Sequence, residues 1–423
     1  MAIVSRADRG ESLTPQTPTT RATCETPPLS VKLTYSFQLY SLQASLSLPA
    51  WYKSWQEYFS PPPGGPDIVK KYGWGSSLPV RIFFPADHDK TSPKPLPTVF
   101  TIHGGGFCLG TNRDDDEYNR FLADSQKVLV VSLNYSKSPA AVFPRPVHDV
   151  EKLYLAVIAD QSLPIARAGP DTSSRIAVLG FSAGGNLAMA MSQLPSIKGS
   201  PNAPSAAISV YGTLDFTRDS MVKLRNRFYK PALPLPQGAR MDSLAGYATV
   251  YDWSYIPYGH DLKDPLLCPV FAPAEALPKH TYFIAAELDI LGHESWRMAV
   301  RVGNEAKKRA NKAKGTGSLS DARDVPDADS KLDRVRCVGK RASNKRKGYL
   351  EDLGGDEDRF GWEDVYADGS SVNWLCVPDV LHGFDHINVQ NQWESEESKA
   401  DAQLKTKAYV ERVGKWLHNV VWK

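Results

Sequence analysis

The chain of 423 residues is long enough for two or three average domains, although α/β folds of this length also form one unit. Its 42% hydrophobic and 23% charged residues describe a globular protein with an ample core. The formal net charge of +3 is small for this length and, with no nucleic-acid-binding motif, argues against a polyanionic partner. The five cysteines are scattered without a C-x-x-C pair, which favours a reducing, cytoplasmic location over a disulfide framework.

The N-terminal region divides into two parts. Residues 1–30 carry mixed charge, threonine and proline but no apolar stretch typical of a secretory signal, so we expect a disordered tail. Residues 31–66 hold leucines and aromatic residues and end in a proline- and glycine-rich break. Two interpretations stay open for 31–58. We favour a cap segment packed over a site, because apolar helix stripes usually face a core, and weak contact with a membrane surface is the alternative.

Strands follow this break. Several continuous apolar runs are typical of parallel strands buried on both faces. We expect strands at 78–84, 98–102, 128–133, 175–179, 206–211, 281–286 and 372–377. Helical segments such as 147–160 and 186–193 lie between them, which predicts βαβ units and a mostly parallel sheet. Ligands of such sheets bind at the carboxyl ends of the strands.

A glycine run follows the strand at 98–102 in His103-Gly-Gly-Gly-Phe107. Glycines let backbone N–H groups converge on one point, as an oxyanion hole requires. His103 precedes the serine motif described next, so we expect it to brace this loop rather than to act as a base. Cys108 is expected to be a small apolar filler.

A serine stands at the apex of a glycine turn in Gly180-Phe-Ser182-Ala-Gly184. A short apolar strand precedes the turn and good helix formers follow it, which is the context of a nucleophile elbow. Glycines two residues before and after the serine let strand and helix pass closely. On the pattern alone, an ordinary glycine-rich loop between strand and helix is the alternative.

An acid and a histidine follow at two further strand ends. Glu287 and Asp289 end the strand at 281–286, and His382 follows the strand at 372–377. Both carboxylates lie on one face of a strand, so either could reach His382, and its strand-end position favours Asp289. A serine hydroxyl needs a base, a histidine can accept and return the proton, and a carboxylate fixes the histidine tautomer.

Together these motifs resemble the hormone-sensitive-lipase-like branch of the α/β-hydrolases, particularly its fungal members. The matching segments are 103–107, 134–149, 180–186, 264–269, 289–294 and 382–384. The resemblance implies an α/β-hydrolase fold: a mostly parallel eight-stranded sheet flanked by helices, with a helical cap. It implies one catalytic domain over 67–423, with an inner cap insertion at about 215–262. It further implies Ser182, Asp289 and His382 as catalytic residues, and Gly105, Gly106 and Ala183 as the oxyanion hole.

The chain departs from the family pattern at three places. Phe181 stands where the family usually has aspartate, and Ile290 where it has proline. The stretch between Asp289 and His382 is far longer than usual, because a charged segment is inserted at about 305–347. This segment has almost no core-forming residues, so we expect it to be disordered. Its basic clusters leave open a localisation signal or an anionic-surface patch, and a misplaced exon boundary is a further alternative.

By this resemblance the expected function is that of a serine hydrolase, cleaving carboxylic esters of small to medium hydrophobic substrates through an acyl-enzyme. The alternatives are an amide or lactone hydrolase of secondary metabolism and a non-catalytic small-ligand receptor on the same fold, which the presence of His382 disfavours. No histidine or cysteine spacing is typical of a metal site, so we expect neither metal nor cofactor. The expected partner is a small-molecule ester, not a nucleic acid. Aromatic residues at 247–258 are expected to line a cap pocket, with a core role as the alternative.

Overall fold

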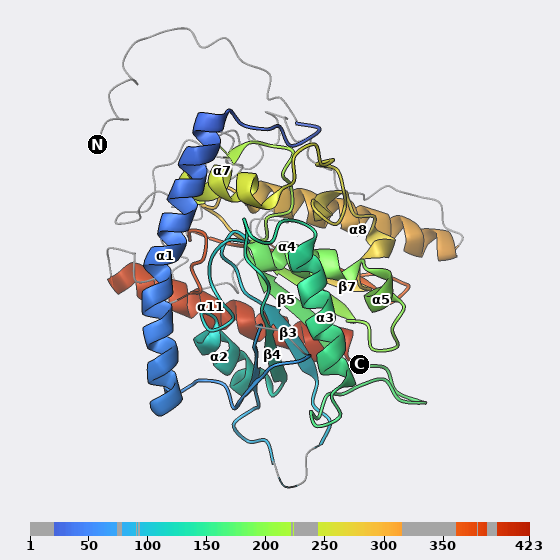
Figure 1. Ribbon diagram of the computed structural model, residues 1–423. Coiled ribbons are helices and arrows are strands. Elements are labelled where there is room, and N and C mark those ends of the chain that lie inside the picture. The colour runs from blue at the N-terminus through green and yellow to red at the C-terminus, as the bar shows by residue number, and fades with distance from the viewer. Residues whose placement is uncertain are drawn as a thin grey trace.

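The computed structural model describes residues 21–73, 78–89, 91, 94–220, 223, 244–314, 361–378, 380–386 and 396–423. Within these residues one sheet has nine strands in the order β1-β2-β4-β3-β5-β6-β7-β9-β8 (Figure 1). The strands are β1 (Ile68–Lys70), β2 (Val80–Phe83), β3 (Thr98–Ile102), β4 (Leu129–Leu133), β5 (Ile176–Phe181), β6 (Ala206–Val210), β7 (His280–Ala286), β8 (Gly361–Val365) and β9 (Ser371–Val377). The six neighbouring strands in the middle of the sheet are parallel: β4, β3, β5, β6, β7 and β9. The remaining strands pair antiparallel at the edges, β1 and β2 at one edge and β8 at the other.

The predicted mostly parallel sheet with flanking helices is confirmed, but the sheet has nine strands where eight were expected. Each strand predicted by residue range lies within two residues of an observed one. Strands β1 and β8 were missed because they are edge strands. Their residues are partly exposed, as at Ile68, Val69 and Val365, and so form no continuous apolar run.

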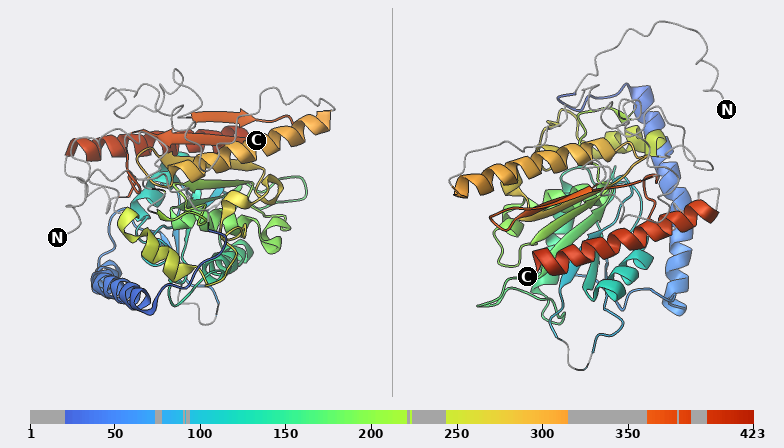
Figure 2. Two further views of the ribbon diagram at one scale, coloured as in Figure 1. Left: turned by 90° about the horizontal axis from the view of Figure 1, so that it is seen from above. Right: turned by 180° about the vertical axis from the view of Figure 1, so that it is seen from behind.

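Helices cover both faces of the sheet. They are α1 (Leu29–Phe59), α2 (Asp116–Gln126), α3 (Arg145–Ala159), α4 (Ala183–Ser192), α5 (Pro195–Lys198), α7 (Leu244–Tyr255), α8 (Gly292–Lys314) and α11 (Glu396–Trp416), with single turns at Pro269–Phe271, Ala274–Ala276 and Leu417–Val421. Helices α3, α4 and α8 lie on one face, and α2 and α11 lie on the other (Figures 1 and 2). Every residue of α4 is buried, which places the helix that follows Ser182 in the core.

Helix α1 runs along the side of the molecule, next to α2 and α7 (Figure 1). Leu39 is its one buried residue. Residues 21–28 lead into it and pair with the inner cap: the carbonyl groups of Ala22 and Cys24 accept hydrogen bonds from the N–H groups of Leu262 and Gly259. The predicted disordered tail is therefore wrong for 21–28, while residues 1–20 lie outside the described residues. No helix in the described part of the chain is both long and apolar enough to cross a membrane.

The segment predicted as a disordered insertion at 305–347 begins inside α8. Ala306 and Ala310 are buried there, and the carboxylate of Glu305 accepts a hydrogen bond from the N–H of Ala274. The expectation of disorder is therefore wrong for 305–314, which form the end of α8. Residues 315–347 lie outside the described residues. Of the predicted inner cap, the structure describes 215–220, 223 and 244–262, which include α7.

Candidate active site

Ser182 stands at a sharp corner between β5 and α4. Its φ of 53° and ψ of −117° are unusual for a residue with a side chain. A Cβ at Gly180 would lie 2.0 Å from the carbonyl oxygen of Gly184, and a Cβ at Gly184 would lie 2.0 Å from that of Ile102. Only glycine fits at these two positions, so the glycines allow the close approach that holds Ser182 at the strand end.

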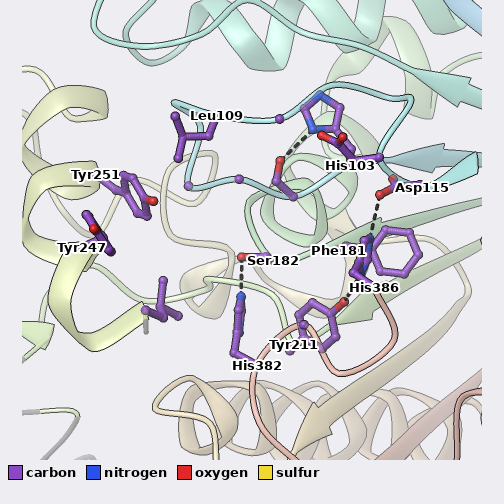
Figure 3. A pocket seen from close by; sticks show the side chains of 17 residues that line it. His103, Leu109, Asp115, Phe181, Ser182, Tyr211, Tyr247, Tyr251, His382 and His386 are labelled. Atoms are coloured by element: carbon purple, nitrogen blue, oxygen red, sulfur yellow. Dashed lines mark hydrogen bonds and ion pairs between the residues drawn. The ribbon is translucent and has the colours of Figure 1, made fainter. Parts of the chain in front are cut away.

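The three side chains predicted to act together form one chain of hydrogen bonds. Figure 3 shows the bond between Ser182 and His382. The Ser182 hydroxyl donates to Nε2 of His382 at 2.9 Å, and Nδ1–H of His382 donates to Oδ2 of Asp289 at 2.7 Å. Asp289, rather than Glu287, accepts this bond, and its other oxygen accepts the N–H of Leu291 at 2.9 Å. The three residues follow β5, β9 and β7, so the carboxyl edge of the parallel sheet brings them together.

The glycine loop after β3 lies against the same serine. Gly105 and Gly106 have φ values of 111° and 59° and line the pocket that contains Ser182. A Cβ at Gly106 would lie 2.3 Å from the ring of Tyr251, so this position also requires glycine. Ala183 begins α4, and the first amides of a helix have no intrahelical acceptor. The three predicted oxyanion-hole residues thus flank Ser182.

His103 braces the glycine loop, as the sequence predicted. Its Nδ1–H donates to the carbonyl of Gly104 at 2.7 Å, and its ring stacks on Tyr135 at 4.4 Å. Lys137 Nζ donates to Nε2 of His103 at 3.1 Å and to Oδ1 of Asn134 at 3.0 Å. Burial, with the charge of Lys137 adding to it, lowers the pKa of His103 well below its usual value. Burial also lowers the pKa of Lys137 to about 7. Neutral His103 is therefore a fixed hydrogen-bonding group behind the loop.

The pocket above Ser182 has a volume of about 330 Å³ and two chemically different ends (Figure 3). Leu109, Tyr247 and Tyr251 form the apolar end, and Asp115 and His386 lie on the other side of the serine. Tyrosines of the segment 247–258 thus line a pocket, as predicted. The alternative core role holds for Tyr255, which is buried and stacks on Phe107 at 3.7 Å.

A buried ion cluster, which the sequence did not reveal, lies beside the pocket. His386 donates from Nε2 to Asp115 at 2.7 Å and from Nδ1 to Asp385 at 3.0 Å, and the hydroxyls of Tyr211 and Tyr409 donate to Asp385. Burial alone would lower the pKa of His386, but its two carboxylate partners outweigh burial and raise it well above its usual value. His386 is therefore a buried imidazolium.

This cluster connects to His382 in two ways. Asp385 and His386 lie in the loop that carries His382, and the Tyr211 ring packs on the His382 ring at 4.8 Å. Phe181, at the position where the family usually has aspartate, turns its ring edge-on to His386 at 4.8 Å. The pair Asp385-His386, directly after the His-Gly-Phe motif, was the sequence signal that could have drawn attention to the cluster.

Glu294 explains the acid at the end of the 289–294 motif. Its Oε1 accepts the N–H groups of Leu214 and Asp215 at 2.7 and 3.2 Å, and its other oxygen pairs with Lys223 at 2.5 Å. Burial raises the pKa of Glu294 to about 7, although Lys223 opposes the shift. This carboxylate fixes the loop after β6, which lies beside the elbow, and is distinct from the acid that contacts His382.

Cys108 has the expected properties of a filler. It is buried, its thiol lies 2.8 Å from the Ser254 hydroxyl, and burial raises its pKa to about 12. Within the described ranges, no group of three or more histidine, cysteine or acidic side chains has the arrangement of a metal site.

Comparison with known proteins places this geometry in a family. A family model described as alpha/beta hydrolase fold matches residues 99–317, which is half of the chain. Arylacetamide deacetylase of Bos taurus is 35% identical over 135 residues, which cover 31% of this chain and 32% of that protein. Arylesterase of Saccharolobus solfataricus is 27% identical over 226 residues, which cover 53% of this chain and 66% of that protein. The chain thus matches less than two thirds of the length of these relatives.

Solved structures share the fold at lower identity. An esterase of Pyrobaculum calidifontis superposes with a TM-score of 0.52 and 20% identity, covering 85% of this chain and 87% of that one. A fungal esterase of Rhizomucor miehei gives a TM-score of 0.52 and 18% identity, covering 84% and 85%. At these identities the similarity is one of fold.

Proposed function

The chain belongs to the α/β-hydrolase family, in its hormone-sensitive-lipase-like branch, and from that premise we propose that it is a serine hydrolase of carboxylic esters. The observation that carries the proposal is the continuous hydrogen-bond chain from the Ser182 hydroxyl through His382 to Asp289. Fold membership alone would not suffice, because one fold hosts many functions. The esterase names of the relatives agree with the assignment.

The reaction follows from the hydrogen-bond directions. His382 Nε2 takes the hydroxyl proton as Ser182 Oγ attacks the ester carbonyl, and Asp289 holds the ring in the required tautomer. The N–H groups of Gly105, Gly106 and Ala183 stabilise the oxyanion of the tetrahedral intermediate. His382 then gives its proton to the leaving alcohol, so an acyl-enzyme remains on Ser182. A water activated by His382 releases the acid and restores the hydroxyl.

Fluorophosphonate labelling, followed by a panel of nitrophenyl esters, tests the proposal. Wild-type protein should label once and hydrolyse esters, and Ser182→Ala should lose both properties while its circular dichroism spectrum is unchanged. Ser45→Ala, a change on the exposed side of α1, is the matched control and should keep both. Labelling that persists in Ser182→Ala would contradict the assignment of the nucleophile.

Amide hydrolysis is the second candidate, because the Bos taurus relative is named an arylacetamide deacetylase. The same residues would act, with His382 protonating an amine leaving group in place of an alcohol. Including acetanilides in the panel compares the two reactions directly. The receptor alternative predicts that small ligands bind without turnover.

The pocket supports small to medium hydrophobic substrates, since about 330 Å³ is at the lower end of the usual range for ligand sites. A reducing, cytoplasmic location is part of the proposal. It rests on the cysteines, because the four that lie in the described residues are all free.

A further inference from the structure

Lys137 is a half-buried cation that the proposed reaction does not use. Its Nζ donates hydrogen bonds to His103 Nε2 at 3.1 Å, to Asn134 Oδ1 at 3.0 Å and to the carbonyl oxygen of Tyr135. Burial lowers the pKa of Lys137 to about 7, although nearby carboxylates oppose the shift. The surroundings thus disfavour the charge itself, and they indicate that the side chain serves as a hydrogen-bond donor.

The bond from His103 to Gly104 fixes the glycine loop against the proposed nucleophile. Nδ1–H of His103 donates to the carbonyl oxygen of Gly104 at 2.7 Å. A Cβ at Gly104 would lie 3.3 Å from Cβ of Ser182, so the loop backbone packs closely against the serine. Gly105 and Gly106, whose N–H groups are proposed to stabilise the oxyanion, follow directly in the chain. A shift of Gly104 would therefore move these donors relative to Ser182, and such donors act only when they are correctly placed.

The tautomer of His103 would be undecided without Lys137. Nδ1 of His103 faces one acceptor, the Gly104 carbonyl, and Nε2 faces another, Asn134 Oδ1 at 3.1 Å. The Asn134 atom is identified as the oxygen, because it also accepts the N–H of Tyr135 at 2.9 Å. A neutral imidazole has one N–H, so it can donate to only one of the two acceptors and must turn a lone pair toward the other. Burial lowers the pKa of His103 well below its usual value, which disfavours the imidazolium that could donate to both.

The Lys137 Nζ resolves this conflict between lone pairs. It lies within hydrogen-bond distance of both Nε2 of His103 and Oδ1 of Asn134, so it donates to both atoms where they face each other. An ammonium group has three N–H groups and a neutral amine has two, so either form of the lysine can make these two bonds. Because Nε2 is then satisfied as an acceptor, the proton of His103 stays on Nδ1, where it donates to the loop.

We propose that Lys137 is a positioning residue of the oxyanion hole: it holds His103 in the Nδ1–H tautomer, and His103 in turn fixes the glycine loop beside Ser182. Asp289 acts on His382 in the same way, since it also fixes a tautomer. The effect of Lys137 on rate rests on the proposed ester hydrolysis. Its effect on the tautomer of His103 is independent of any reaction.

Nitrogen-15 NMR of the full chain, labelled in its histidines, measures the tautomer directly. His103→Gln identifies the signals of this residue by their loss. At about pH 8, above the usual pKa of histidine, wild-type His103 should be neutral and protonated at Nδ1. Lys137→Met has a side chain of similar length without N–H groups, so it should shift the population toward Nε2–H, which can donate to Asn134. Lys152→Met, a change on the exposed side of α3, is the matched control and should leave the His103 signals unchanged.

Steady-state kinetics with a nitrophenyl ester measure the consequence for the oxyanion hole. In Lys137→Met, kcat should fall about tenfold or more while KM stays within about threefold, because the oxyanion donors act on the transition state rather than on the bound ester. Lys152→Met should keep the wild-type values of both constants. Circular dichroism of both variants checks that they are folded.

Three outcomes would overturn the proposal. They are wild-type His103 that is protonated at Nε2, a Lys137→Met variant in which the His103 tautomer is unchanged, and a changed tautomer without a loss of kcat. The first of these is measured on the wild type, so it decides the question even where Lys137→Met does not fold. Wild-type protein that hydrolyses no ester would contradict the proposed function instead, because the NMR result still shows whether Lys137 sets the tautomer of His103.

Discussion

Two carboxylates, Glu287 and Asp289, lie at the end of β7, and their position decides which one accepts the hydrogen bond from His382. Asp289 and Glu287 are both buried, but the hydrogen bond of 2.7 Å from His382 goes to Asp289, and Leu291 N–H fixes its other oxygen. A carboxylate in this place orients the imidazole and stabilises the imidazolium that forms when Ser182 reacts.

Asp289→Asn should therefore lower kcat for nitrophenyl esters by about 10³- to 10⁴-fold, because an amide favours the wrong histidine tautomer. Glu287→Gln should lower it less than about tenfold, since Glu287 does not accept the His382 hydrogen bond. Steady-state kinetics of both variants, with Tm measured alongside, checks the ranking. The reverse order would assign the acid to Glu287, and equal losses would contradict the predicted ranking.

The buried imidazolium of His386 makes stability depend on pH in a defined direction. Its folded pKa lies well above the value of about 6.5 in an unfolded chain. Its contribution to stability is therefore complete below about pH 6.5 and disappears as the pH rises through the folded pKa. Burial would raise the pKa of Asp385, but hydrogen bonds from His386 and two tyrosines lower it, so its contribution is lost only in acid. Burial raises the pKa of Asp115, which opposes these terms.

We expect His386→Gln to lower the free energy of unfolding by about 3–5 kcal/mol near pH 6, because it leaves buried carboxylates without their cation. The difference from wild type should shrink as the pH rises through the folded pKa of His386. Urea unfolding at several pH values measures it. His148→Gln, a half-exposed histidine paired with Glu151, is the control and should change stability by no more than about 0.5 kcal/mol. A difference independent of pH would mean that His386 is uncharged.

The sequence patterns identified residues that belong to motifs. They missed residues whose importance depends on being buried in the fold. The three candidate catalytic residues were found because each follows an apolar strand and stands in a short sequence motif: Ser182, Asp289 and His382. His386 was missed because its partner Asp115 is 271 positions away in the chain. Nothing local to either residue shows that both are buried, and burial is what makes their pairing important.

At the scale of elements, the predictable strands are those buried on both faces. Strands β3 to β7 and β9 have only buried residues, so each is a mostly apolar run that can be read directly from the sequence. The edge strand β8 alternates and exposes Val365, and its pairing with β9 depends on tertiary structure. Helix α8 extends into the segment predicted to be disordered, because alanines, Ala306 and Ala310, form its buried face within a strongly charged stretch.

The end of α8 therefore decides which part of the charged segment can be removed. Replacing 318–346 with a flexible Gly/Ser linker should leave ester hydrolysis and Tm nearly unchanged, because a charged segment of low hydrophobicity contributes little to a core. Replacing 308–346 should lower Tm clearly, since it deletes the buried Ala310 and the last turns of the helix. Thermal unfolding and activity of the two deletions give the comparison. A folded but inactive 318–346 deletion would show that the segment shapes the site.

At the scale of the whole molecule, the two sides of α1 have different surroundings. Its inner face contributes to a wall of the site, because Leu39 clusters with Val250 and Cys108, and Tyr251 of the pocket packs against this cluster. Among the described residues that line the pocket, none comes from α1. Its outer face exposes large apolar side chains such as Phe37 and Trp51. The sequence showed an apolar helix, but only the fold decides which side of it meets the protein.

The bounded pocket predicts a definite dependence on acyl-chain length. Each methylene buried against Leu109, Tyr247 and Tyr251 is worth about 0.8 kcal/mol, which is about fourfold in kcat/KM. Once the chain reaches this wall, further carbons must displace packed side chains, and Tyr251 has no room to move toward Gly106. We therefore expect kcat/KM for nitrophenyl esters to rise from acetate to a short or medium chain and then to fall.

Tyr247→Ala tests whether the wall sets this limit. Tyr247 is half-exposed, so its truncation should cost little stability while it lengthens the apolar end of the pocket. The optimum should move to a longer acyl chain, and the rate with acetate should stay within about twofold of wild type, because acetate does not reach the wall. Tyr40→Ala, an exposed tyrosine on α1 outside the pocket, is the control and should leave the profile unchanged. A wild-type rate that keeps rising through long acyl chains, or an optimum that Tyr247→Ala does not move, would show that this wall does not bound the substrate.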